Sequence, residues 1–157
     1  DLPVRWAALL MSLGEDGTRR TLRRLRCSNA CIEETAVLVR EAVSGVPVSL
    51  NIYARRLLGK YNLCTVQRLA ALGTALQPEH AADFAALSEL AEQLDADGVC
   101  CRVSQLAVNG RDLMAAGVPA GPGIRKVLEA LLDGVIRAEY PNEKPALLAA
   151  AQKIIAS

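Results

Sequence analysis

Hydrophobic residues recur every three or four positions along most of the chain, the spacing that places side chains on one face of an α-helix. The clearest example covers residues 122–136, where the apolar positions are Ile124, Val127, Leu128, Leu131, Leu132, Val135 and Ile136. Charged residues occupy the other side at steps of four, as a solvent-facing surface does: Arg125, Glu129, Asp133 and Arg137. This segment is predicted to be a helix with one buried stripe, entered through Pro122.

Turn residues and breaks in periodicity divide the rest of the chain into further helical segments. The expected helices cover residues 2–13, 19–26, 29–43, 49–58, 63–76, 79–97, 113–116, 122–136 and 144–155, with a turn at 45–47 and a helical turn near 104–106. No run alternates between apolar and polar residues with a period of two, so no strand is predicted. The fold class is therefore all-α: an irregular bundle of about eight to ten short helices without a sheet.

Several helix ends and faces can be assigned to particular residues. The 2–13 helix is expected to be buried nearly all round, and Thr18 is expected to cap the helix that follows, with Leu22 and Leu25 in the core. Gly117 suits the left-handed position just past a helix end. In the 79–97 helix the core positions are Phe84, Leu87, Ala91 and Leu94.

The length of 157 residues suits a single domain, 1–157, or two small lobes, 1–98 and 99–157, that share a core. The first residues, Asp1 to Pro3, lead directly into apolar positions without an initial Met, so we expect a part of a longer protein. No signal peptide and no apolar run of membrane-spanning length is present. Five cysteines form no framework pattern, which favours reduced thiols in the cytoplasm.

The net charge of +1 conceals an asymmetry between the two halves. Residues 1–78 carry 11 Lys and Arg against 6 Asp and Glu, whereas residues 79–157 carry 7 against 11. A basic half can meet phosphate groups, which favours nucleic acid as a partner. Aromatic residues are only 3% of the chain, which disfavours a platform that stacks single-stranded bases.

The sequence offers few residues that could serve as ligands of a metal ion. A metal phosphohydrolase needs several histidines and carboxylates around its ions, and the only histidine is His80, in a polar helix start. A zinc site would need two close cysteine pairs or added histidines, and neither Cys27 with Cys31 nor Cys100 with Cys101 has them. The cysteines are therefore interpreted as buried and inert, and no metal site is predicted.

Basic residues cluster most densely between residues 19 and 26. The cluster consists of Arg19, Arg20, Arg23, Arg24 and Arg26, with a weaker group at Arg55, Arg56 and Lys60. On a helix, Arg19, Arg23 and Arg26 share one face. Two interpretations stay open for each group: a solvated basic surface, or a patch that contacts an RNA backbone.

The start of the 122–136 helix is a second candidate contact. Free N–H groups and the positive end of the helix dipole would lie at the turn that contains Gly121 and Gly123, with Arg125 and Lys126 in the first turn. A phosphate could be held there, and Arg111 is a further candidate RNA contact. The alternative is that the glycines and Pro122 only shape the turn.

The stretch from residue 106 to residue 142 resembles the C-terminal region of bacterial tRNA nucleotidyltransferases. In that family a Gly-x-Asp-Leu-(Met/Ile)-x-x-Gly segment precedes a Gly-Pro turn and an Ile-x-x-x-Leu-x-x-Leu-Leu helix, then an Asn. The matching residues here are Gly110, Asp112, Leu113, Met114, Gly117, Gly121, Pro122, Ile124, Leu128, Leu131, Leu132 and Asn142. Two segments near the start of the chain fit more loosely: Arg5 to Gly14 and Leu22 to Asn29.

The resemblance implies an all-α C-terminal domain of an enzyme that adds or repairs the 3′ CCA end of tRNA. This domain would hold the acceptor-stem and T-arm side of tRNA, while an N-terminal catalytic head would use magnesium with CTP and ATP. The head's Gly-Ser pair and Asp-x-Asp are missing, since Asp95 and Asp97 have the spacing but end an acidic helix. The chain itself is thus expected to be non-catalytic and to need no cofactor.

Two alternatives for the chain, and one question about its parent enzyme, stay open at this point. The chain could be the corresponding part of a poly(A) polymerase, or a free-standing helical module that binds proteins through the acidic 79–97 helix. Within the resembled family, the parent enzyme could add CCA, only CC, or only A.

Overall fold

In the computed structural model, which describes residues 1–42 and 49–156, every regular element is a helix. The α-helices are α1 (Leu2–Leu10), α2 (Gly14–Arg24), α3 (Asn29–Ala42), α4 (Leu50–Lys60), α5 (Leu63–Leu76), α6 (Ala81–Ala96), α7 (Gly110–Ala115), α8 (Pro122–Ile136) and α9 (Lys144–Ala156). Three 3-10 helices connect them: η1 (Met11–Leu13), η2 (Pro78–His80) and η3 (Val103–Gln105). The described residues contain no strand, which confirms the all-α prediction.

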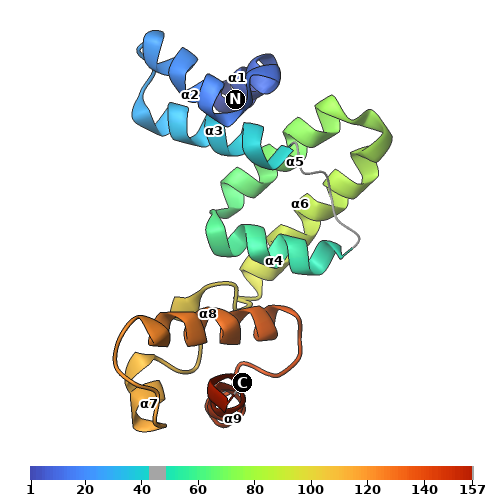
Figure 1. Ribbon diagram of the computed structural model, residues 1–157. Helices are drawn as coiled ribbons and strands as arrows, with labels where there is room; N and C mark the ends of the chain where they lie inside the picture. The colour runs from blue at the N-terminus through green and yellow to red at the C-terminus, as the bar shows by residue number, and fades with distance from the viewer. Residues whose placement is uncertain (43–48, 157) are drawn as a thin grey trace.

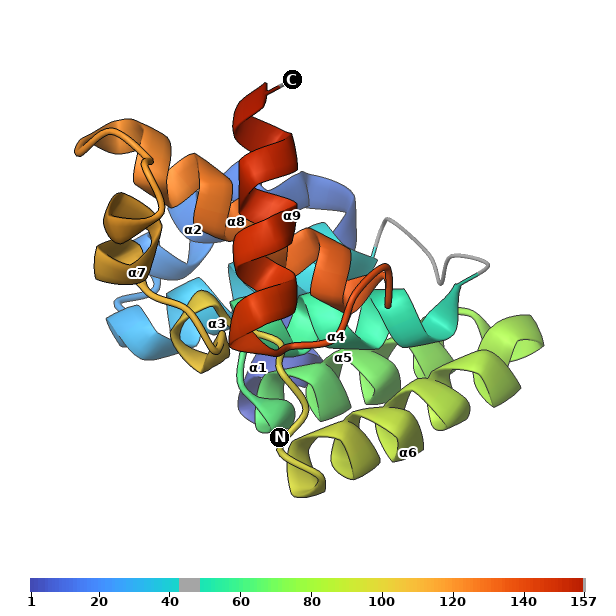
Figure 2. The same ribbon diagram turned by 90° about the horizontal axis from the view of Figure 1, so that it is seen from below.

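The helices are stacked in three tiers, with the two termini at opposite ends of the molecule (Figure 1). Helices α1, α2 and α3 form the upper tier, α4, α5 and α6 the middle tier, and α7, α8 and α9 the lower tier. The upper and middle tiers are joined by contacts of α5 with α1 and α3, and the lower tier is joined mainly through α8 with α4 and η3. Seen from below, α9 crosses over α8 with α7 beside them (Figure 2).

The buried apolar residues form two large clusters and one small one. The first unites the upper and middle tiers around fully buried side chains such as Leu38, Leu57 and Leu87. The second lies within the lower tier and includes Leu131 and Leu147. The small cluster fills the space between α1, α2 and α3: Leu10, Leu22 and Ile32. The two large clusters lie on the two sides of a boundary near residue 100, and the expected division into 1–98 and 99–157 stays a prediction.

The first helix differs from its prediction. It ends at Leu10 and continues as the 3-10 turn η1, and only Ala7 and Leu10 are buried. Leu2 is 60% exposed and Leu9 is 70% exposed, so the expectation of a helix buried all round was wrong. The reason is one-sided packing: α1 contacts α2, α3 and α5, and the side that carries Leu2 and Leu9 stays exposed.

The second helix begins earlier than predicted and uses Thr18 differently. Gly14, at φ +64°, turns the chain, and α2 starts there, so Thr18 lies inside the helix. Its side chain is fully buried and its hydroxyl Oγ1 donates a hydrogen bond to the Leu10 carbonyl oxygen at 3.5 Å. Leu22 is buried as predicted, but Leu25 follows the helix end and is 54% exposed, contrary to its expected place in the core.

Most other elements agree with their predictions. Helix α5 covers the predicted residues 63–76, and the predicted core positions of α6 are all buried. Pro122 occupies the first turn of α8, and Gly117 has φ +97° just past α7. Helix α7 differs from its predicted range of 113–116: it covers Gly110–Ala115, because the Asn109 side chain accepts hydrogen bonds from the N–H groups of Arg111 and Asp112 and starts the helix earlier. The turn expected at 45–47 and the end of the helix at residue 43 lie outside the described residues.

Candidate functional site

Three arginines of α2 form an exposed cationic surface. Arg20, Arg23 and Arg24 are exposed and have no ion-pair partner among the described residues. They line a shallow hollow of about 480 Å³ together with Leu13, Gly17 and Thr21. We call Arg20, Arg23 and Arg24 the α2 arginine surface.

The other two arginines of the predicted cluster have different surroundings. Arg19 is only 22% exposed, because its guanidinium bridges Glu15, at 2.9 Å, and Glu33. The hydrogen bond to Glu33 contributes most to raising the pKa of Arg19 above its usual value. Arg26 is exposed but lies beyond the end of α2, at φ +56°. The face predicted for Arg19, Arg23 and Arg26 on one helix is therefore wrong, since α2 ends at Arg24.

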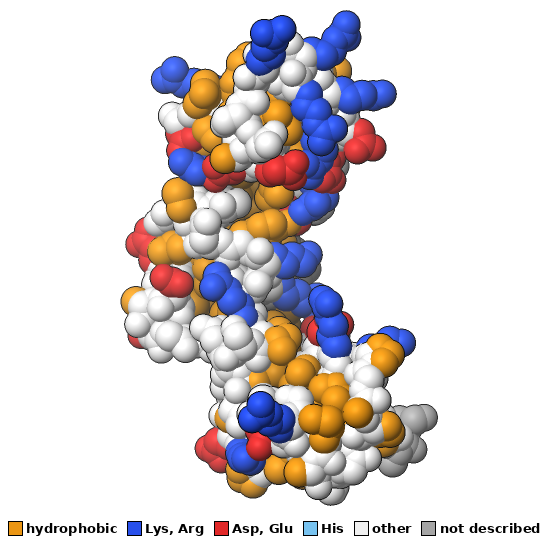
Figure 3. Space-filling model, turned by 90° about the vertical axis from the view of Figure 1, so that its left-hand side faces the viewer, with side chains coloured by type: hydrophobic (Ala, Val, Ile, Leu, Met, Phe, Trp, Pro, Cys, Tyr) orange, Lys and Arg blue, Asp and Glu red, His pale blue; other side chains and the backbone are white. Residues whose placement is uncertain are grey.

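Lysine and arginine side chains continue from the upper tier toward the lower one. Figure 3 shows them gathered around the top of the molecule and then along one side of this face. Among the exposed basic residues of the middle tier and the segment that follows it are Arg56, Lys60 and Arg102. Acidic side chains are interspersed with the basic ones in the same view, mainly at the base of the upper tier. The path is therefore predominantly, and not uniformly, basic.

A cleft of about 630 Å³ lies between α4 and α8. One wall carries Arg56 and Lys60 of α4, and the floor includes Arg102 and Val103. The opposite wall is formed by α8: Glu129, Leu132, Asp133 and Ile136. The cleft thus combines three cations, two carboxylates and an apolar surface.

Some of the charged side chains in this cleft are already paired with each other or with a neighbouring residue. Asp133 accepts hydrogen bonds from Arg56 and from Arg137, each at 2.7 Å. The bond from Arg56 is the largest cause that lowers the pKa of Asp133. Lys60 has no ion-pair partner among the described residues, so its ammonium group is available to an anion.

The weaker basic group of the sequence analysis is divided by the structure. Arg56 and Lys60 line the cleft, whereas Arg55 donates from Nη1 to the Val135 carbonyl oxygen at 3.5 Å. The Arg55 Nε is buried and has no hydrogen-bond partner. Arg102 was missed by sequence reasoning, because it is some forty residues from α4 in the chain and has no basic neighbour. Only its contact with the end of α4 would have revealed it.

The predicted phosphate seat lies at the opposite end of α8 from the cleft. Gly121, at φ +139°, precedes the helix without a side-chain cap, and Gly123 lies in the first turn. Arg125 is 85% exposed and pairs with Glu129 at 2.8 Å, and Lys126 and Arg111 are exposed. Pro122 has no N–H group, and the Ile124 N–H donates to the Gly121 carbonyl oxygen at 3.2 Å, so the first turn offers fewer free N–H groups than the prediction assumes. Phosphate binding there stays a prediction.

The described part of the chain has no cluster of side chains suited to a catalytic metal ion. No group of three or more His, Cys, Asp or Glu side chains there could hold a metal ion. Asp95 and Asp97 are exposed at the end of α6, without a third ligand nearby. These residues do not fit a magnesium site, so no catalytic step is assigned to this chain. None of the described helices is long and apolar enough to cross a membrane.

Comparison with known proteins identifies a family for this chain. The family model described as tRNA nucleotidyltransferase domain 2 matches residues 3–151. The CCA-adding enzyme of Geobacillus thermodenitrificans (strain NG80-2) is 30% identical over 149 residues, which is 92% of this chain and 35% of that enzyme. No solved structure matches the chain significantly.

Two further relatives match shorter parts of the chain with higher sequence identity. The CCA-adding enzyme of Levilactobacillus brevis is 56% identical over 45 residues, or 29% of this chain and 11% of that enzyme. The CC-adding tRNA nucleotidyltransferase of Shouchella clausii (strain KSM-K16) is 43% identical over 61 residues, or 39% of this chain and 16% of that enzyme.

The fold and the surface define an all-α domain with a basic face and, among its described residues, no cluster of side chains that could hold a metal ion. With the family model matching nearly its whole length, the chain belongs to the tRNA nucleotidyltransferase family, which confirms the predicted family. The chain spans 35% of the length of the Geobacillus enzyme, so the activity of a whole enzyme is a separate question.

Proposed function

We propose that this chain is the tRNA-binding part of an enzyme that adds or repairs the 3′ CCA end of tRNA, and that it is non-catalytic by itself. A catalytic head in the same protein would use magnesium with CTP and ATP. The family and the relatives named CCA-adding enzymes support the role in CCA addition. The non-catalytic part is supported by the described residues, which contain no cluster of metal ligands.

The observation that carries the RNA-binding role is the α2 arginine surface. These three exposed guanidinium groups have no carboxylate partner among the described residues, whereas Arg19 on the same helix is neutralised by Glu15 and Glu33. Unpaired cations gain the most from phosphate, since no ion pair has to be broken first. Contacts of this kind fix the position of an RNA without reading its bases, which suits an enzyme that accepts many tRNAs.

Lys60 in the cleft, and Arg125 and Lys126 at the start of α8, are proposed as further backbone contacts. They lie in the middle and lower tiers, whereas the α2 arginine surface lies in the upper tier (Figure 1). An elongated RNA held at several tiers would be recognised by its shape rather than by its sequence.

The test is a fluorescence-anisotropy titration of the chain with folded tRNA and with an unrelated duplex, from low to physiological salt. We expect tighter binding of tRNA. The triple variant Arg20→Gln, Arg23→Gln, Arg24→Gln should weaken it and reduce the salt slope by roughly 0.9 for each phosphate that is no longer neutralised. The matched triple Lys variant keeps the charges and should keep most of the slope.

A second control is Arg19→Gln on the same helix. Because Arg19 is already paired with Glu15 and Glu33, this variant should leave the salt slope unchanged. Equal binding of tRNA and the unrelated duplex, or a wild-type slope in the triple Gln variant, would overturn the proposed role of the α2 arginine surface.

A further inference from the structure

The end of α4 is held by the side chain of a residue from the segment between the middle and lower tiers. Arg102 donates from Nε to the Leu58 carbonyl oxygen and from Nη2 to the Tyr61 carbonyl oxygen, each at 3.2 Å. The last carbonyl groups of a helix lack partners within it, and a cation there also meets the negative end of the helix dipole. The planar guanidinium donates to the two oxygens from two different nitrogens, a fixed fork that the single nitrogen of a lysine ammonium does not provide.

The backbone on either side of Arg102 is fixed as well. The side-chain oxygen of Gln105 accepts hydrogen bonds from the N–H groups of Cys101 and Arg102, each at 2.9 Å. Gly59 of α4 packs directly on the Cys101 carbonyl oxygen, so closely that a Cβ on Gly59 would overlap it. The Cys100 side chain belongs to the lower-tier core and the Cys101 side chain to the upper one.

Polar contacts also connect α4 to α8 across the cleft. Arg56 reaches Asp133 at 2.7 Å, and Arg55 reaches the Val135 carbonyl oxygen at 3.5 Å. We call Arg55, Arg56, Gly59, Arg102 and Asp133 the α4 joint. Cys100 and Cys101 belong to different apolar cores, and the lower tier contacts the rest of the chain mainly through α8 with α4 and η3, so the orientation of the lower tier depends on this joint.

We propose that Arg102 is a positioning residue that fixes the lower tier relative to the upper two, and thereby selects RNA of tRNA shape over shorter or differently shaped duplexes. The proposal rests on the proposed function, in which contacts lie on several tiers. A ligand held at two sites gains affinity only when the spacing between the sites matches the ligand. A loosened joint would lose that gain while leaving each separate contact intact.

Direct contact of Arg102 with phosphate is the competing explanation, and two variants separate it from positioning. Arg102→Lys keeps the positive charge but loses the two-nitrogen fork that donates to the Leu58 and Tyr61 carbonyl groups. Gly59→Ala changes no charge and instead pushes on the Cys101 backbone. Positioning predicts that both variants lose selectivity, whereas direct contact predicts that both bind like the wild type.

The experiment measures two properties of the wild type, Arg102→Lys, Arg102→Met and Gly59→Ala. Small-angle X-ray scattering without RNA reports the distribution of distances within the molecule. Anisotropy titrations report affinity for tRNA and for a short hairpin that can reach only one tier. We expect broader distance distributions in all three variants, affinity for tRNA reduced about tenfold or more, and affinity for the hairpin unchanged.

Each result decides one question. Unchanged scattering in all three variants would overturn the joint, and wild-type tRNA affinity in Arg102→Lys together with weak binding by Arg102→Met would show direct contact instead. Failure of the wild-type chain to prefer tRNA would overturn the proposed function, while the scattering would still decide whether Arg102 fixes the tiers. Circular dichroism checks that each variant is folded. If Arg102→Met does not fold, Gly59→Ala tests the joint independently.

Discussion

Cys100 and Cys101 are consecutive in the chain, yet their side chains are buried in two different hydrophobic cores. Residues 99–101 lie outside any helix and Arg102 is extended, at φ −131° and ψ 150°, and in extended backbone neighbouring side chains point to opposite sides. Each thiol fills its own core, and burial raises the pKa of both. The pair therefore connects the tiers through packing, which is a structural reason for two adjacent cysteines.

Thiol accessibility tests this arrangement. Cys64 is exposed, whereas Cys100 and Cys101 are buried, and their raised pKa values keep both thiols protonated at neutral pH. Because the thiolate is the reactive form, Ellman's reagent should modify Cys64 rapidly and reach Cys100 and Cys101 only on unfolding. Cys64→Ser should remove the fast phase. Rapid modification of Cys100 or Cys101 in the folded protein would contradict the assignment.

A tight contact between α5 and α6 predicts a sensitive glycine. A Cβ on Gly73 would overlap the ring of Phe84, which is buried in the core of the upper two tiers. Gly73→Ala should lower the free energy of unfolding by about 1–3 kcal/mol, as overpacking does. Gly123→Ala is the matched control, since nothing lies within 4 Å of its added Cβ. Urea unfolding should separate the two variants; equal stabilities would show that α5 and α6 can move apart freely.

Asn109 is predicted to stabilise α7 through its side-chain oxygen. That oxygen accepts from the N–H groups of Arg111, at 2.8 Å, and Asp112, at 3.2 Å. Asn109→Ala should cost about 1 kcal/mol of unfolding free energy, whereas Asn109→Asp keeps the acceptor and should cost little. Thermal unfolding followed by circular dichroism measures both. If the two variants were equally destabilised, the acceptor would not be the cause.

Stability toward acid should depend in part on Asp133. The hydrogen bond from Arg56 lowers the pKa of this carboxyl below the ordinary 3.8, so the folded state binds its proton less tightly than the unfolded state does. Its contribution is therefore fully present above the ordinary value and is lost as the pH falls through the lowered pKa. Urea unfolding from pH 7 down to acid should show a smaller pH dependence in Asp133→Asn. A dependence equal to that of the wild type would mean that the Arg56 contact contributes nothing.

Much of the helix pattern could be predicted because it depends on local spacing. Helix α5 and the buried stripe of α8 follow directly from the positions of their apolar residues. The errors occur where a distant element overrides a local signal. Thr18 resembles a cap in the sequence, but it is fully buried inside α2 and its hydroxyl donates to the Leu10 carbonyl oxygen of α1. Leu9 resembles a core residue, but no described element covers that side of α1.

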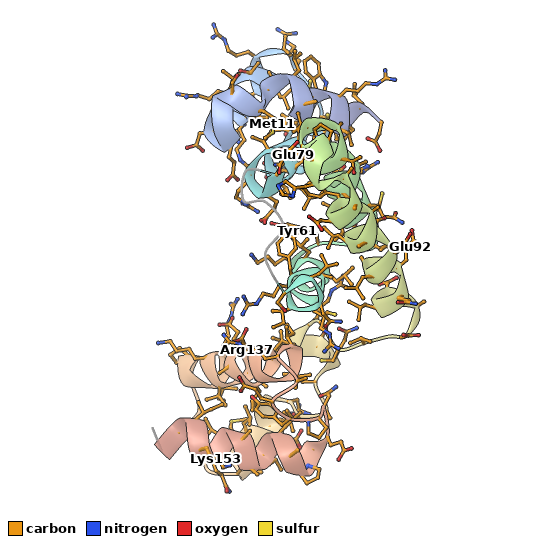
Figure 4. The ribbon with its side chains drawn as sticks, turned by 90° about the vertical axis from the view of Figure 1, so that its right-hand side faces the viewer. Met11, Tyr61, Glu79, Glu92, Arg137 and Lys153 are labelled. Atoms are coloured by element: carbon orange, nitrogen blue, oxygen red, sulfur yellow. The ribbon has the colours of Figure 1, made fainter. Side chains whose placement is uncertain are left out.

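The candidate RNA contacts also depend partly on local sequence and partly on distant elements. The arginines of residues 19–26 are conspicuous in the sequence, but the carboxylates that neutralise Arg19 come partly from α3 and could not be assigned by spacing. The network around Tyr61, which donates to Glu41 at 2.7 Å and is contacted by Arg40, likewise joins the turn after α4 to α3 (Figure 4). Such pairs are far apart in the chain, so only the packing of the tiers brings them together.

The sequence by itself determined the all-α class, the helix boundaries with strong turn residues, and the family, because each depends on residues that are close in the chain. Tertiary structure alone decided which cations remain unpaired among the described residues, where the cleft forms, and that Arg102 closes the end of α4. The physical reason is that hydrogen bonds and ion pairs are short-ranged. They are decided by the side chains that folding places within a few ångströms, and these come from segments up to eighty residues apart, as with Arg55 and Val135.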